Sequence, residues 1–117
     1  MKAVVRSVYS SDVDVESYVP DDPRDAGLWI RLLVGPADGE GEESFDVLVC
    51  TPAWLQRVVH EKGPQIGRHH LIVEELEVDE ILTFLRHRFE EVEASTWDAL
   101  AEKLGRIGYW EFEDYRP

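Results

Sequence analysis

Acidic and aromatic side chains alternate at the end of this chain, in the stretch YWEFEDYRP. The acids Glu111, Glu113 and Asp114 stand among the tyrosines Tyr109 and Tyr115. In an extended strand successive side chains point to opposite faces, so Glu111, Glu113 and Tyr115 would share one face. Tyrosine beside carboxylates suits a surface that takes Arg or Lys from a partner protein. We therefore expect this segment to contribute to a protein-binding surface.

A simpler interpretation of the same segment stays open, in which Trp110 and Phe112 close the hydrophobic core and the acids are merely solvated. A second acidic stretch lies between two apolar runs, where glycines at positions 35, 39 and 41 indicate a turn. Its carboxylates are a further candidate binding surface, formed by Asp38, Glu40, Glu42 and Glu43.

The residue types that catalysis or metal binding requires are not arranged for either task. The single cysteine, Cys50, follows an apolar run and is expected to be a small buried side chain. His69 and His70 are adjacent, so in a strand they would point to opposite faces, a poor arrangement for holding one ion. The chain has no Gly-x-Ser-x-Gly motif and no glycine-rich phosphate loop. We therefore predict no catalytic residues, no metal and no cofactor.

The net charge restricts the partners that this chain can bind. Its 117 residues include 25 acids and 12 lysines and arginines, which gives a net charge of −13. The excess is spread along the chain, with 11 acids and 4 bases up to residue 50 and 14 acids and 8 bases after it. Such a surface disfavours nucleic acid and anionic membranes and favours a basic protein partner. The alternative is that the charge serves solubility alone.

The apolar pattern predicts one domain, residues 1–117, of the α+β class. Period-two and apolar runs predict strands at 2–10, 28–35, 44–50 and 71–76, and the ending is a candidate fifth strand. Helical spacing predicts helices at 52–62, 78–94 and 95–108, with Thr51 and Ser95 as N-caps. We expect a mainly antiparallel sheet of about four to five strands with about three helices packed on one face.

Neither a leader nor a membrane span is indicated by the sequence. The amino terminus, MKAVVRSVYSSD, has no long apolar region, and no stretch of the chain approaches a membrane span in length. One unpaired cysteine fits a reducing compartment. We therefore expect a cytoplasmic protein.

Laid out in this order, the segments resemble a known family. The hairpin GLWIRLLVGP…ESFDVLVCTPAWL, the strand HHLIVEELEVDEIL and the ending STWDALAEKLGRIGYWEFEDY resemble the immunity protein 8 family of bacterial polymorphic toxin systems. The most specific parts are Thr51-Pro52-x-Trp54-Leu55, Trp97 and Trp110-Glu111-Phe112.

The resemblance implies a small antidote that binds a cognate toxin domain and blocks its activity. It carries no catalytic residue and no binding face to this chain. The toxins of such systems are diverse and many are nucleases, whose basic clefts would complement a charge of −13. Binding over the toxin's active site and binding beside it both stay open.

Two other functions stay open beside the antidote. The first strand could be a sheet edge, and pairing across a two-fold axis would make the chain a self-associating structural or adaptor module. The oligomeric state is therefore not predicted. A small enzyme would require a concave pocket with a buried titratable group whose pKa is shifted.

Overall fold

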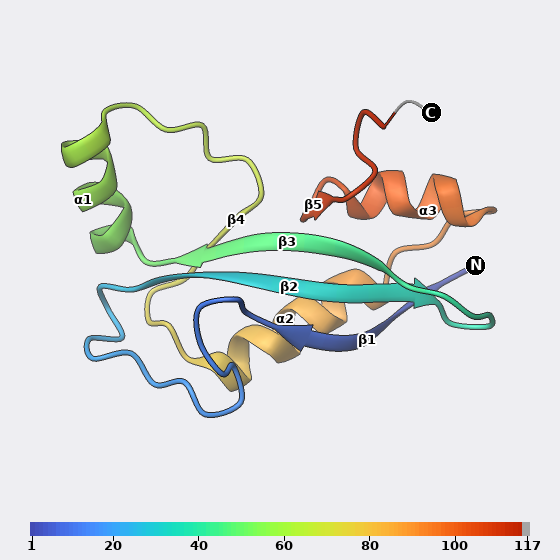
Figure 1. Cartoon of the computed structure of the whole chain (residues 1–117), viewed down its shortest axis with the longest axis horizontal. Helices are drawn as coiled ribbons and strands as arrows, with labels where there is room; N and C mark the ends of the chain where they lie inside the picture. The colour runs from blue at the N-terminus through green and yellow to red at the C-terminus, as the bar shows by residue number, and fades with distance from the viewer. Residues whose placement is uncertain (116–117) are drawn as a thin grey trace.

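The computed structural model describes residues 1–115, which form five strands and three helices (Figure 1). Arg116 and Pro117, the last two residues of the acidic and aromatic ending, lie outside the described residues. The elements in chain order are β1 (Ala3–Tyr9), β2 (Gly27–Pro36), β3 (Glu43–Cys50), α1 (Pro52–Lys62), β4 (His70–Ile72), α2 (Val78–Glu90), α3 (Trp97–Leu104) and β5 (Tyr109–Trp110).

One mostly antiparallel sheet organises the molecule. The strand order is β1-β2-β3-β4, and only the β3–β4 pairing is parallel. β5 also pairs with β3, at residues 45–46, whereas β4 pairs with residues 48–50. Because β2 occupies one edge of β3 along its whole length, β4 and β5 share the other edge at opposite ends. The sheet and its three helices confirm the predicted α+β class.

The hairpin of β2 and β3 supplies the centre of the core. Its register pairs Ile30 with Val47 and Leu32 with Phe45, and all four side chains are at most 1% exposed. Arg6 from β1 holds the connecting turn, because its guanidinium donates to three backbone carbonyls there. The turn is therefore fixed from outside the hairpin as well as by its own glycines.

Of the three helices expected on one face of the sheet, two cover it. The buried stripe of α2 includes Leu85 and Phe89, and that of α3 includes Leu100 and Leu104. The ring of Phe89 meets the ring of Phe45 edge to face, with 5.6 Å between centroids. Figure 1 shows α2 behind the sheet and no helix in front of it. We call this side, which no helix of residues 1–115 covers, the open face of the sheet.

The first helix differs from the other two because it buries none of its side chains. It lies beyond the end of β3, away from α2 and α3 (Figure 1). Thr51 caps it as predicted, accepting from the N–H of Trp54 at 3.4 Å, and also binds the backbone of Ala26. The Trp54 ring packs on Gly27, where an added Cβ would lie 2.2 Å from it. A side chain at position 27 would therefore displace α1.

Three predicted details are wrong. The strand predicted at 71–76 is β4, which ends at Ile72 because the chain bends at Glu74 and Glu75 before α2. The N-cap of α3 is Thr96 and not Ser95, since the Thr96 side chain accepts from the N–H of Ala99 at 3.2 Å. The ending is not a strand throughout, because β5 has two residues and the chain then turns over residues 111–114. Phe112 consequently does not close the core, and its side chain is 38% exposed.

Candidate functional site

A groove between α3 and the C-terminal turn collects acidic and aromatic side chains. It has a volume of about 590 Å³, and in the described part of the chain its lining includes no lysine, arginine or histidine. These residues are four acids and three aromatics: Glu43, Asp98, Glu102, Asp114, Trp110, Phe112 and Tyr115. We call this set the acidic groove. Its composition favours a cationic side chain of a partner, because carboxylates and aromatic faces both attract Lys and Arg.

Glu43 fixes the base of the acidic groove. Its carboxylate accepts from the indole N–H of Trp97 at 2.8 Å and from that of Trp110 at 3.0 Å. Glu43 begins β3, Trp97 begins α3 and Trp110 lies on β5, so one side chain joins three elements. Such a shared acceptor sets the orientation of both rings. Glu43, predicted as a binding residue of the hairpin turn, therefore also has a structural role.

Three aromatic rings follow one another along the groove. Trp110 and Phe112 meet edge to face at 5.9 Å between centroids, and Phe112 meets Tyr115 in the same way at 5.5 Å. The Tyr115 side chain is 63% exposed. Edge-to-face contacts leave ring faces open to a guest. The turn after β5 therefore presents aromatic surface instead of burying it.

Two acids of the groove, Asp98 and Glu102, were missed in the sequence. They lie four residues apart on α3, so they share one side of the helix, and both are exposed. Like charges at this spacing repel each other by roughly 0.2–0.5 kcal/mol, a cost that a bound cation would relieve. The signal that could have identified them is this spacing, on the side of the helix opposite Leu100 and Leu104.

Two predicted residues of the ending are engaged within the chain. Glu113 forms a two-bond ion pair with Arg68, one bond of which is 2.6 Å long. The Arg68 guanidinium lowers the pKa of Glu113 below its ordinary value. Glu111 accepts from the backbone N–H of Ser44 at 3.0 Å. These two carboxylates therefore hold the C-terminal turn against β3 and the segment before β4.

The acids of the hairpin turn lie elsewhere. Asp38, Glu40 and Glu42 are exposed, and none of them lines the acidic groove. Their expected role in binding a partner stays a prediction. Of the predicted binding residues, the structure therefore brings together only Glu43, Asp114 and Tyr115 in one hollow.

Tyr109 points to the opposite side of the sheet from Trp110. In the sheet, Tyr109 of β5 lies opposite Asp46 of β3. Asp46 lies opposite Arg31 of β2, and Arg31 lies opposite Tyr9 of β1. These four residues form a row across the open face, and the Arg31 guanidinium binds the Asp46 carboxylate at 2.7 and 2.8 Å. The Tyr109 ring lies 3.9 Å from that of His69. Tyr109 therefore belongs to the open sheet face and not to the acidic groove.

The groups that could support catalysis are poorly placed. Burial raises the pKa of the Cys50 thiol to about 11, so it stays protonated at neutral pH. The Nε2 atom of buried His69 lies 2.5 Å from the carbonyl oxygen of Gly105, and Nδ1 of His70 lies 2.9 Å from that of Arg68. Across residues 1–115, no three His, Cys, Asp or Glu side chains are grouped so that they could hold a metal ion. The same residues contain no helix long and apolar enough to cross a membrane.

Comparison with known proteins identifies a family for this chain. No curated protein and no solved structure shows significant similarity to the chain. The family described as immunity protein 8 matches residues 3–115, which include every strand and helix. Members of such families act in toxin systems and are generally not catalysts. The chain therefore belongs to the immunity protein 8 family.

Proposed function

We propose that this chain, acting as one domain, neutralises a cognate bacterial toxin domain by binding it through the acidic groove, without catalysis. The observation that carries the proposal is the groove itself, in which four carboxylates surround three aromatic rings and, within residues 1–115, no basic side chain is among the lining residues. A Lys or Arg of the toxin would enter between Asp98, Glu102 and Asp114. Membership of the immunity protein 8 family supports a toxin as the partner.

The net charge of −13 supports a basic toxin, and a nuclease is the class that fits best. A nuclease cleft is basic because it must attract phosphates, so an acidic inhibitor associates with it quickly. The same charge keeps the inhibitor away from the nucleic acid itself. We place this function in the cytoplasm of the cell that needs protection, with the toxin blocked at its cleft.

A co-expression rescue with pull-down tests the function. The toxin domain encoded beside this gene is induced in cells with and without the chain. We expect growth to be restored and a stable complex to be recovered. Unrelieved toxicity with no complex would overturn the proposal.

A charge-neutral triple variant tests the groove. Asp98→Asn, Glu102→Gln and Asp114→Asn together should lower the association rate about tenfold and reduce its dependence on salt. Asparagine is suited to position 114, where φ is +58°. The matched control removes the same charge from exposed acids outside the groove: Asp12→Asn, Glu16→Gln and Asp21→Asn. Equal effects of the two triples would show that charge acts globally and that the groove is not the site.

The alternative function, self-association through the first strand, has less support. Both the N–H and the C=O of Val5 in β1 are bound by side chains of α2, at 2.8 Å each. A second copy would have to break these bonds before it could pair there. Light scattering over a range of concentrations separates the two functions, since a concentration-independent monomer excludes the structural module.

A further inference from the structure

The two outer strands of the sheet are protected unequally. On β1, Glu90 accepts from the Val5 N–H and Arg86 donates to the Val5 carbonyl. The chain before β1 also bridges the segment after α2, where the N–H of Ala94 donates to the carbonyl of Met1 at 3.1 Å. Charged side chains on an edge strand are a common protection against pairing with another chain. The edge at β1 is therefore protected at Val5 and at the chain that precedes the strand.

The edge at β4 has no such protection. The N–H of Leu48 donates to the carbonyl of His69, and the N–H of Val73 donates to that of Cys50. In a parallel ladder these bonds direct the backbone of alternate residues toward β3, so the N–H and C=O of Ile72 point outward. No hydrogen bond from elsewhere in the described chain reaches them. Ile72 is also 56% exposed.

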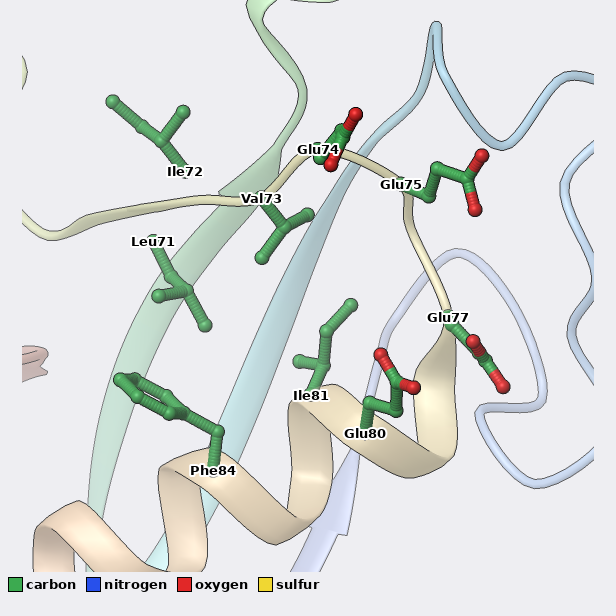
Figure 2. Close-up of a pocket in the computed structure, with 9 residues that line it drawn as sticks. All are labelled: Leu71, Ile72, Val73, Glu74, Glu75, Glu77, Glu80, Ile81 and Phe84. Atoms are coloured by element: carbon green, nitrogen blue, oxygen red, sulfur yellow. The ribbon is translucent and has the colours of Figure 1, made fainter.

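An apolar groove of about 540 Å³ accompanies this open edge. Figure 2 shows Leu71 and Val73 pointing from the β4 segment toward Ile81 and Phe84 of α2. The Phe84 side chain is 47% exposed although it lies beside this apolar lining. An added strand would have alternate side chains on the helix side of the sheet, next to Phe84. The side chains of a further strand on this side of the sheet would therefore fill the groove.

The rim of this groove is acidic. Glu74 and Glu75 pair with Arg24 at 3.5 and 3.1 Å, and their side chains stay largely exposed. Glu77 and Glu80 also line the groove and form no ion pair within residues 1–115. A second copy of this chain, related by a two-fold axis, would bring these carboxylates toward their own counterparts and be repelled. A basic segment would instead be attracted.

We infer that the outer edge of β4 binds an extended segment of the toxin domain, in which apolar side chains alternate with lysine or arginine. The segment pairs with the Ile72 backbone, places an apolar side chain against Phe84 and sets a cation near Glu77 and Glu80. This inference rests on the proposed function. β4 and β5 lie on the same edge of β3, so one toxin domain can contact both the open edge and the acidic groove.

The test removes the outward N–H of β4. Ile72→Pro deletes that donor and leaves the bonds to β3 intact, since proline is tolerated on an edge strand whose N–H faces solvent. The probe is the toxin domain encoded beside this gene, carrying an inactivating substitution. Titration calorimetry should show about a tenfold loss of affinity for Ile72→Pro. Ile72→Val, which keeps the N–H, should lose less than about threefold.

A second variant and a second readout guard against misfolding. Phe84→Ser removes a half-exposed ring, and we expect about a tenfold loss of affinity while the cooperative thermal transition of the fold is retained. In the complex, exchange of the Ile72 amide with deuterium should slow at least about tenfold relative to the free chain. Wild-type affinity in both variants with no slowing at Ile72 would overturn the inference.

The outcomes separate this inference from the proposed function. If the wild-type chain neither binds nor rescues, the proposed function fails. If it binds and rescues while the Ile72 amide stays unprotected, only the role of the β4 edge fails. A wild-type dimer that becomes monomeric on Ile72→Pro would show that a second copy occupies the edge, and the inference of a toxin segment would be wrong.

Discussion

Trp110 donates the hydrogen of its indole nitrogen to the carboxylate of Glu43, over a distance of 3.0 Å. This bond connects the last strand of the chain to the first residue of β3, 67 positions earlier. The bond holds the Trp110 ring, which lines the acidic groove, in one orientation although the chain turns directly after it. The groove therefore depends on a long-range contact that also contributes to folding stability.

Glu43→Ala should destabilise the folded chain by about 1–3 kcal/mol, because two partly buried indole donors lose a charged acceptor. Urea unfolding followed by tryptophan fluorescence measures the difference. The neighbouring exposed residue provides the control, and Glu42→Ala should stay within about 0.5 kcal/mol of wild type. Equal losses for the two variants would contradict the structural role of Glu43.

The ion pair of Arg68 and Glu113 should make stability depend on pH. The pKa of Glu113 is lower in the folded chain than in the unfolded one, because Arg68 donates to its carboxylate. The stabilisation is therefore present above the unfolded pKa of about 4.3 and is lost as the pH falls through the folded pKa. Urea midpoints of wild type and Glu113→Gln should differ at pH 7, and the difference should shrink as the pH falls below the unfolded pKa and through the folded one. A difference that does not shrink on acidification would mean that the pair is not its source.

Cys50 should be unreactive in the folded chain. Its pKa of about 11 leaves little thiolate at pH 8, and its side chain is fully buried. We expect alkylation at pH 8 to be at least about 100-fold slower in buffer than in 6 M urea, where the thiol has an ordinary pKa of about 8.5. An exposed cysteine introduced by Ser17→Cys supplies the rate for an accessible thiol. Rapid labelling of folded wild type would contradict the burial of Cys50.

The two phenylalanines of α2 should differ strongly in their contribution to stability. Phe89 is fully buried against Phe45, so Phe89→Ala should cost about 3–5 kcal/mol. Phe84 is 47% exposed, and Phe84→Ala should cost less than about 1 kcal/mol. Thermal or urea unfolding of both variants provides the comparison. Similar losses would show that the exposed groove is part of the core.

The parts of the fold that follow from local patterns were predictable. The alternation in residues 44–50 identified Phe45, Val47 and Val49 as one face of β3, and helical spacing identified Leu85 and Phe89. Thr51, Pro52 and Gly63 marked α1 because capping chemistry is local. Long-range pairing was less accessible. The parallel β3–β4 contact joins segments on either side of α1, and its three-residue strand has no distinctive period.

The candidate site was predictable only in part, for the same reason. Asp114 and Tyr115 were identified from their composition, and Glu43 from the hairpin turn, but nothing local indicated that they would meet. The strand assumption placed Tyr109 and Tyr115 on one face, whereas the turn after β5 sends them to different surfaces. The sequence shows Asp98 and Glu102 four positions apart on a helix. Only the packing of α3 beside β5 brings them into the same groove as Asp114 and Tyr115.

The unequal edges of the sheet also limit how many molecules can assemble. A chain with two open edges can accept a strand on each side, and repeated addition then continues without end. Here Glu90 and Arg86 occupy the outward backbone groups of Val5 on the β1 side, so β4 is the less protected place for an incoming strand. Strand addition at β4 is therefore expected to give a complex with one partner segment for each chain. Two side chains of α2, which never touch that partner, favour this stoichiometry.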